Sequence, residues 1–292
     1  MLPDVKIETF RLGDDVEAWA NEIAVDPDTA PELVVLTDPF SCDANKLVPW
    51  LDAAFPDSTT IGGIASGTAA PGESILLLND ELYRTGAIGI ALSGNVEIDT
   101  IVAQGCKPVG SPMFITRAAG SVLYELDGVP AMLTLEKLFT SLDEDERDLA
   151  RNSLFLGVVM HDQQEVYEHG DFLIRNIVGV DPEAQAIAVA TELREGSIAQ
   201  FHIRDAHTST ADLQELLAKH QYGAPSGALL FSCMGRGQDL YGSPNHDTEL
   251  FHNQMGTVPM GGFFSNGEIG PVQGRTFLHS YTSAFGLFRP KH

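Results

Sequence analysis

Basic residues are scarce in this sequence. The 17 lysines and arginines stand against 41 aspartates and glutamates, which gives a formal net charge of −24. Proteins bind phosphate backbones through positively charged surfaces, so this balance argues against nucleic acid as a partner. Anionic membrane surfaces are disfavoured for the same reason. We interpret the acidity as a source of solubility.

Long hydrophobic runs are also absent. No apolar stretch approaches the roughly 20 residues that a helix needs to span a bilayer, so the sequence predicts no membrane segment. The N-terminal stretch MLPDVKIETF has neither the basic start nor the apolar core of a secretory signal peptide. We therefore expect a cytoplasmic protein.

Cysteine is rare, and its spacing carries no metal motif. The three cysteines are Cys42, Cys106 and Cys233, and no two of them form a CxxC pair. The histidines and carboxylates do not recur at metal-ligand spacing either, so the sequence predicts no metal site. An odd number of cysteines in a reducing compartment indicates free thiols.

The common motifs of catalysis and nucleotide binding are missing. The chain has no GxGxxG ahead of a helix, no GxxxxGK[ST] and no HExxH. The segment GGIASG at 62–67 differs from a GxSxG nucleophile elbow, because its serine comes one place late and no helix is evident after it. These absences predict a protein that is not an enzyme and that needs no cofactor.

The residues that are present predict a folded protein of mixed secondary structure. With 292 residues, 43 % of them hydrophobic, the chain can form one large domain or two ordinary ones. Short runs of Ile, Val and Leu between glycine-containing or acidic turns predict strands, and amphipathic stretches predict helices. The expected strands include 33–37, 172–180, 197–205, 227–233 and three within 260–288, and the expected helices include 47–55, 133–142, 145–152, 209–220 and 247–256.

Two helix details follow from proline and capping chemistry. Pro49 is tolerable only in the first turn of a helix, which agrees with a helix that begins near Leu47. Ser209 or Thr210 can cap the helix over 209–220, since a side-chain oxygen there accepts a free backbone N–H.

One order of elements occurs twice. Strand, helix, glycine-containing strand, strand and strand follow one another over 33–92 and again over 227–288. In sequence, Phe40-Ser41-Cys42 aligns with Phe231-Ser232-Cys233, Gly62-Gly63 with Gly261-Gly262, and Ser66-Gly67 loosely with Asn266-Gly267. This pattern predicts an α/β (α+β) fold of two related layered units, with mixed β-sheets, flanking helices and an internal pseudo-repeat. Ligand pockets often form where two such halves meet.

Polar residues special to the second copy are candidate ligand contacts. Arg236 lies between glycines and can offer a planar fork to a ligand carboxylate, or it can pair with an acid of the protein. Glu268 lies in a predicted tight turn, where it can bind a ligand amine, cap backbone amides or face water. His279 alternates with Phe277 and Tyr281 on one strand face, which fits a hydrogen-bonded core residue or a ligand contact.

Two cysteines lie beside these candidates. Cys233 ends a predicted strand near Arg236, so it can be a nucleophile with a lowered pKa or an inert residue that packs in the core. We include Cys233 among the candidate ligand contacts. Residues 104–112, rich in glycine and proline, predict a rigid irregular segment that joins the two halves, with Cys106 facing the same interface.

These segments together resemble one protein family. The carriers are Asp38-Pro39-Phe40-Ser41, GGIASG at 62–67, QGCKPVG at 104–110, ELDG at 125–128, GDFLIR at 170–175, QFHIRD at 200–205, FSCMGRG at 231–237 and GEIGP at 267–271. The chain resembles the FIST family, and most closely its plant and cyanobacterial branch. The match covers nearly the whole chain, with a FIST N-terminal-like domain over 1–118 and a FIST C-terminal-like domain over 119–292.

The resemblance implies a sensory module that binds an amino acid or a similar small molecule in intracellular signalling. It implies no catalytic residues, and a signalling protein as a further partner. Some relatives are haem-based nitric oxide sensors, for which His279 or His252 would be the axial ligand by side-chain chemistry. Others are F-box adaptors, which implies a protein-recruiting scaffold as a second alternative. Family members usually carry a further segment before the residues equivalent to Asp4 and Val5, so the resemblance predicts an incomplete N-terminal domain.

Overall fold

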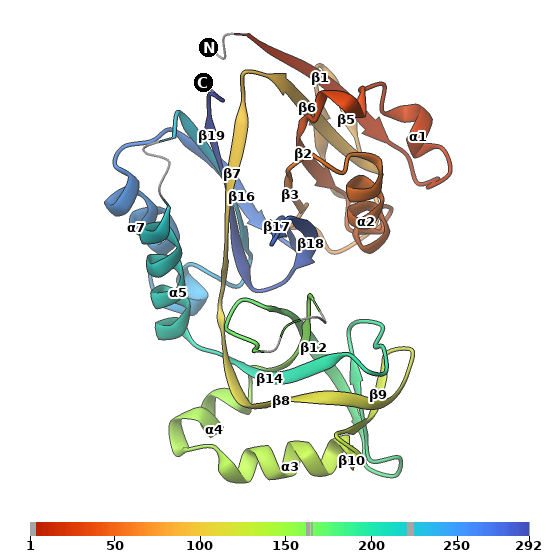
Figure 1. Ribbon diagram of the computed structural model, residues 1–292, viewed down its shortest axis with the longest axis vertical. Helices are drawn as coiled ribbons and strands as arrows, with labels where there is room; N and C mark the ends of the chain where they lie inside the picture. Colours follow the sequence, from red (N-terminus) through yellow and green to blue (C-terminus); the bar gives the residue numbers. More distant parts are fainter. Residues whose placement is uncertain (1–3, 162–163, 165, 221–224, 292) are drawn as a thin grey trace. The chain divides into compact units, whose positions relative to one another are not determined.

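A computed structural model of the chain describes residues 4–161, 164, 166–220 and 225–291 (Figure 1). Helices and mixed sheets alternate along it, which confirms the predicted α/β (α+β) class. The chain divides into two compact units: Met1–Ala103 with Leu213–His292, and Gln104–Asp212. The first unit is thus formed by both ends of the chain, and the second by the sequence between them. The domain division expected between residues 118 and 119 stays a prediction.

The first unit contains a six-stranded sheet to which both ends of the chain contribute. Its order is β1-β6-β2-β3-β17-β18. The strands are β1 (Val5–Leu12), β6 (Ala87–Gly94), β2 (Glu32–Thr37), β3 (Thr60–Ile64), β17 (Glu268–Val272) and β18 (Arg275–His279). Strands β2 and β3 are parallel and the other neighbours are antiparallel.

The same unit contains a second sheet with the order β16-β15-β19-β7. Its strands are β16 (Met260–Ser265), β15 (Gly227–Cys233), β19 (Thr282–Arg289) and β7 (Glu97–Gln104). Strand β15 is parallel to β16 and antiparallel to β19, as β2 is parallel to β3 and antiparallel to β6. The series β7-β19-β15-β16 therefore repeats the series β1-β6-β2-β3, and the predicted pseudo-repeat is present.

Three hydrophobic clusters stack these elements in layers. Helices α1 (Trp19–Glu22) and α2 (Ala44–Ala54) pack on the first sheet through Trp19, Leu47 and Leu51. On the second sheet lie α7 (His246–Met255) and, from Leu213 onward, α5 (Ala206–Lys219). Residues of both sheets, among them Ile61 and Phe231, meet in a cluster between them. The first unit is thus a helix–sheet–sheet–helix sandwich, which buries both faces of each sheet.

Two helices begin earlier than the sequence predicted. The Asp43 side chain accepts the N–H of Asn45, so α2 begins at Ala44 and Pro49 lies in its interior rather than in its first turn. Asp205, and not Ser209 or Thr210, caps α5, because its carboxylate accepts the N–H of Thr208 at 2.7 Å. In both cases an aspartate upstream of the predicted start is the N-cap.

The register of the sheets corrects two parts of the repeat alignment. Gly62 corresponds to Gly262 and not to Gly261, because a Cβ at either glycine would lie 1.9 Å from the carbonyl oxygen of the residue opposite. Gly62 lies opposite Val35 in the first sheet, and Gly262 lies opposite Leu230 in the second. This places Phe231-Ser232-Cys233 opposite Phe263, Phe264 and Ser265 within β15, whereas Phe40-Ser41-Cys42 follows the end of β2. The two FSC segments are therefore not equivalent, and the match between them is a coincidence of short sequence.

The second unit is a sheet that closes on itself. Its order is β10-β9-β13-β12-β11-β14-β8, and β8 pairs with β9 as well. The strands are β8 (Cys106–Ala119), β9 (Val122–Leu126), β10 (Val129–Pro130), β11 (Leu154–Val159), β12 (Phe172–Asp181), β13 (Ala186–Val189) and β14 (Ile198–Arg204). Helices α3 (Ala131–Ser141) and α4 (Glu144–Ala150) accompany the sheet, and Leu138 and Ala150 join its buried core.

Three further expectations about elements need correction. The segment 104–112 is not irregular, because most of it belongs to the long strand β8. Residues 260–288 form parts of four strands rather than three. Strand β1 was not expected from the sequence, and in the structure only Phe10 and Leu12, near its C-terminal end, are buried. The remaining elements, 3-10 helix η1 (Pro27–Thr29), hairpin strands β4 (Leu76–Leu78) and β5 (Glu81–Tyr83), and α6 (Gln238–Tyr241), lie in the first unit.

Candidate functional site

A buried ion pair lies at one end of the second sheet, where β15 ends and β19 begins. The Arg236 side chain is fully buried, and its guanidinium donates to Asp247 through Nε at 2.8 Å and through Nη2 at 3.2 Å. Arg236 follows β15, and Asp247 is in the first turn of α7, so the pair ties a strand end to a helix start. Of the two readings of Arg236 from sequence, the structure shows the internal one: pairing with an acid of the protein.

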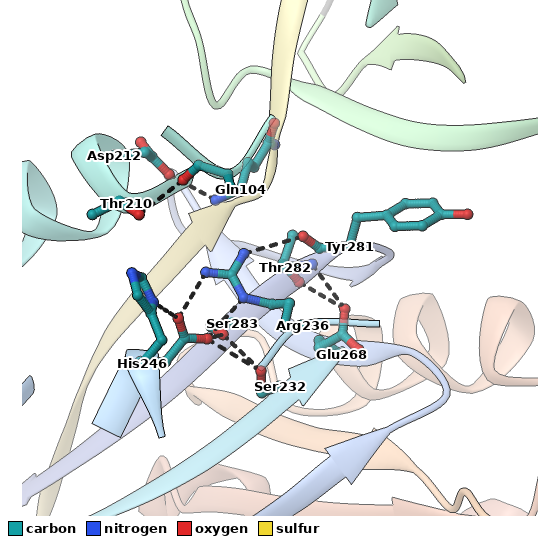
Figure 2. A network of polar contacts seen from close by, with 12 residues as sticks. Gln104, Thr210, Asp212, Ser232, Arg236, His246, Glu268, Tyr281, Thr282 and Ser283 are labelled. Carbon is teal, nitrogen blue, oxygen red and sulfur yellow. Dashed lines mark hydrogen bonds and ion pairs between the residues drawn. The ribbon is translucent and has the colours of Figure 1, made fainter. Parts of the chain in front are cut away.

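Asp247 collects further donors around this pair. The Nδ1 atom of His246 lies 2.9 Å from Oδ1, and the hydroxyls of Ser232 and Ser283 donate to Oδ2. Figure 2 shows Arg236, His246, Ser232 and Ser283 converging from separate elements. Burial opposes the ionisation of Asp247, but these hydrogen bonds and the Arg236 charge outweigh it and hold its pKa well below the ordinary value. Asp247 is therefore ionised at neutral pH.

Glu268 forms a second buried acidic centre. Its carboxylate accepts the Ser265 hydroxyl at 2.8 Å, and the Thr282 hydroxyl and N–H at 2.8 and 3.2 Å (Figure 2). The residue is fully buried, so it does not face water, and its contact with a backbone N–H resembles the predicted capping role. Burial raises its pKa to about 7, although the donors and the Arg236 charge act in the opposite direction.

We expect Glu268→Gln to change how stability depends on pH. Between the ordinary pKa of 4.5 and the folded value of about 7, folded Glu268 keeps a proton that the unfolded chain has lost. Stability from this group is therefore full below about pH 4.5 and falls as the pH rises to about 7. The unfolding free energy of Glu268→Gln relative to the parent should rise by on the order of 2 kcal/mol across that window.

Urea titrations of both proteins from pH 4.5 to 8 measure this difference. Glu32, whose pKa burial also raises to about 7, is present in both proteins and cancels. A difference that stays constant with pH would show that Glu268 ionises in the folded state as it does in water.

His279 and Cys233 lie near these centres with different surroundings. His279 is buried, and its Nε2 lies 2.9 Å from the carbonyl oxygen of Gly270, so Nε2 carries the proton. This is the hydrogen-bonded core arrangement considered from sequence. Cys233 is partly exposed at the end of β15, with no disulfide. Neither residue lines the cavity described next.

A cavity of about 360 Å³ lies against the Asp247 network, within the first unit. Its walls come from β15, β16, the segment ahead of α7, and α7 itself. The lining residues are Leu230, Ser232, Gly237, Pro244, Asn245, Asp247, Thr248, His252 and Met260 to Phe264. Ser232 and Asp247 belong to both the network and the cavity, so the network reaches the cavity wall through these two side chains, whereas Arg236 and Glu268 do not line it.

The cavity combines an apolar side with a few polar groups. Leu230, Met260 and the two phenylalanines of β16 supply apolar surface, and the glycines Gly261 and Gly262 add no side chains of their own. Asn245 and Thr248 contribute an amide and a hydroxyl. Such a composition, and a volume at the lower end of the roughly 300–1,000 Å³ range, are typical of sites for small ligands.

The sequence analysis singled out Arg236 and Glu268, neither of which lines the cavity, and missed Asp247 and Ser232, which do. Asp247, Ser232 and Ser283 come from α7, β15 and β19, and no short motif connects them. The usable signal was physical: a buried arginine requires an acid partner. With 41 acidic residues in the chain, the sequence could not say which acid it was.

Two other features are absent from the described ranges. No group of three or more His, Cys, Asp or Glu residues in those ranges is arranged to hold a metal ion. None of the helices in the same ranges has both the length and the apolar character needed to cross a membrane.

Fold and site define a two-unit α/β protein with a small cavity beside a buried charge network. Residues 3–129 match the FIST N domain, and residues 131–271 match the FIST C domain. The chain therefore belongs to the FIST family, as its segments indicated. FIST domains are associated with sensing in signal transduction.

Similar proteins occur in mycobacteria and in animals. The uncharacterized protein Rv0628c of Mycobacterium tuberculosis (strain ATCC 25618 / H37Rv) is 36 % identical over 264 residues, covering 89 % of this chain and 69 % of the relative. The uncharacterized protein Mb0898c of Mycobacterium bovis is 34 % identical over the same length, covering 89 % and 68 %. Human F-box only protein 22 is 28 % identical over 127 residues, covering 38 % of this chain and 30 % of its own.

Proposed function

We propose that this chain is a sensory module that binds a small molecule in the cavity between β16 and α7, and that it carries out no chemistry of its own. The observation that carries the proposal is the shared wall. Asp247 and Ser232 line the cavity and also belong to the network that connects α7, β15 and β19. A ligand in the cavity contacts Asp247, on which three elements converge. Binding can therefore change how α7, β15 and β19 are held together.

The chemistry of the cavity indicates the kind of ligand. The cavity wall presents the Asp247 carboxylate, whose charge is compensated by Arg236, a buried residue outside the cavity lining. Asn245 and Thr248 can hydrogen-bond a polar group, while Met260, Phe263 and Phe264 offer apolar contact. We therefore propose a small metabolite with a polar end and an apolar body, a class that includes amino acids.

A thermal-shift screen against amino acids and small metabolites tests this function. A ligand present at about 100 times its Kd stabilises the folded chain by about 2.7 kcal/mol, which corresponds to a rise in Tm of roughly 5 °C or more. We expect at least one compound to reach this shift. We also expect Thr248→Trp, which fills the cavity, to abolish it.

A neighbouring residue supplies the matched control. Glu249 is exposed on α7, next to Thr248, and does not line the cavity. Glu249→Trp introduces the same side chain and should keep the full shift. The proposal fails if no compound in a broad panel stabilises the protein, or if Thr248→Trp responds as strongly as Glu249→Trp.

Haem is the alternative ligand that the family resemblance raised. An axial histidine needs a free ring nitrogen beside the cavity. His279 does not line the cavity, and His252 does, but the Nε2 of each lies within 3.2 Å of a backbone carbonyl oxygen, those of Gly270 and Val258 respectively. These contacts favour a small metabolite over haem. Absence of a Soret band after haem reconstitution would agree with this assignment.

A further inference from the structure

The pseudo-repeat makes two hairpins equivalent. In chain order, hairpin β4–β5 follows β3 and precedes β6 in the first half. Hairpin β17–β18 follows β16 and precedes β19 in the second half. The second hairpin pairs with the other half: β17 runs antiparallel to β3, with Glu268 opposite Gly63 and Ile269 opposite Gly62. A hairpin of the second half therefore covers the edge strand of the first half.

Strand β16 is the equivalent edge strand in the second half, and no hairpin covers it. Among the described residues, its one strand neighbour is β15. The carbonyl oxygens of Pro259 and Ser265 accept the N–H groups of Ala228 and Met234, so these positions of the β16 segment face β15. Successive residues of a strand face opposite sides, so Met260 and Gly262 direct their N–H and C=O groups to the open side. The carbonyl oxygen of Phe264 accepts the Ser66 hydroxyl, so the accessible part of the edge is Met260 to Gly262, where Gly261 and Gly262 are exposed.

Hairpin β4–β5 carries an exposed apolar surface that is suited to cover this edge. Leu77 lies directly opposite Leu82, and the two side chains are 66 % and 51 % exposed. Ile75, on the same face as Leu77, is 54 % exposed. Within the described chain the hairpin pairs with no strand outside itself. Exposed apolar hairpins with open edges are templates for strand addition.

The two hairpins differ in how they are connected. Two residues, Asn266 and Gly267, link β16 to β17, whereas residues 65–75 link β3 to β4 without regular structure. The short link holds β17 near the edge of β3. The long link lets β4–β5 lie on the β6 side of its own sheet, away from the position that the repeat assigns to it.

We propose that a second copy of this chain supplies the missing partner: β4 of one copy adds antiparallel to β16 of another. The apolar face with Leu77 and Leu82 then covers Phe264, which is 46 % exposed on β16. Each copy carries both a hairpin and an open edge, so two copies related by a two-fold axis make the contact twice. This inference goes beyond the proposed sensing function and does not need it, although the two share one element, because β16 also forms a wall of the cavity.

Sedimentation velocity of the full chain tests the self-association. We expect the parent protein to sediment as a dimer at tens of micromolar, and Leu77→Asp to weaken the dimer at least tenfold. Val178→Asp is the matched control, because Val178 is 63 % exposed in the second unit, on β12. It should leave the dimer unchanged. The formal charge of −24 per chain opposes association, so the dimer should strengthen with salt.

Cross-linking identifies the contact. A Leu77→Cys chain is mixed with a Phe264→Cys chain, both carrying Cys233→Ser, since Cys42 and Cys106 are buried. A short bis-maleimide should join the two chains only in the mixture, and Val178→Cys with Phe264→Cys should give no product. The proposal is overturned by a monomeric parent, by a dimer that Leu77→Asp leaves intact, or by a cross-link that forms within one monomeric chain carrying both cysteines.

Discussion

Replacing Arg236 with methionine will lower the free energy of unfolding by about 3–5 kcal/mol, because removal of one partner leaves the other charge buried without compensation. Asp247 is ionised and 7 % exposed, so it would lose both guanidinium contacts and keep only the weaker donors from His246, Ser232 and Ser283. Urea unfolding followed by tryptophan fluorescence measures the loss in the first unit, and far-UV circular dichroism also follows the second unit, where the control variant described next lies. Both tryptophans, Trp19 and Trp50, lie in the first unit.

An exposed ion pair gives the matched control for this prediction. Arg151 pairs with Asp148 at 2.7 Å, and the two side chains are 69 % and 64 % exposed. Such pairs contribute about 0–1 kcal/mol, so Arg151→Met should move the urea midpoint very little. A double variant, Arg236→Met with Asp247→Leu, should recover part of the loss, since neither charge then remains buried. Equal effects of Arg236→Met and Arg151→Met would contradict the account.

Gly262→Ala will destabilise the first unit by about 3 kcal/mol or more, through overpacking and backbone strain together. A Cβ at this position would lie 1.9 Å from the carbonyl oxygen of Leu230, which is part of the paired strand and cannot move aside. The backbone adds a second cost, because Gly262 has a φ of +144°, where side chains are rarely tolerated.

The residue next to it separates this effect from a general intolerance of β16 to substitution. A Cβ at Gly261 would lie 3.6 Å from the nearest atom, a methyl carbon of Leu229, which is ordinary contact. Gly261→Ala should therefore change the free energy of unfolding by about 0.5 kcal/mol or less. Urea unfolding of both variants decides the point. Comparable losses for the two alanines would refute the close approach at Gly262.

The repeat gives the same prediction in the first sheet. A Cβ at Gly62 would lie 1.9 Å from the carbonyl oxygen of Val35, the residue opposite it. The glycine shared by the two halves is thus required by the close approach of a parallel neighbour, and not by a ligand. This is the physical reason why glycine recurs in both copies.

Patterns of apolar residues and glycines predicted the fold class and the pseudo-repeat from sequence alone. These features depend on local sequence, in runs of a few residues that form a strand or a turn. The predicted starts of α2 and α5 were wrong because Asp43 and Asp205, upstream of those starts, act as the N-caps. Helix propensity alone does not show which of several possible caps a helix uses. The pairing of FSC segments failed because strand register depends on the neighbouring strand.

The site could be predicted only in part. Arg236 and Glu268 drew attention as charged residues among glycines, and the structure buries both in one region, around β15, β17 and β19. The cavity and the role of Asp247 depend on the approach of α7 to β16, which no local pattern records. His279 matched its core interpretation, since its ring is hydrogen-bonded to Gly270.

Binding of a small molecule in the cavity beside Asp247 can be followed directly through the methyl group of Met260. Methyl-labelled methionine gives one NMR signal per methionine, and Met260 lines the cavity. Met113 and Met132 belong to the second unit and serve as references. A stabilising metabolite should shift the Met260 signal in a saturable way and leave the Met113 and Met132 signals in place. Shifts confined to Met113 and Met132, or no shift with any metabolite of the panel, would contradict binding in this cavity.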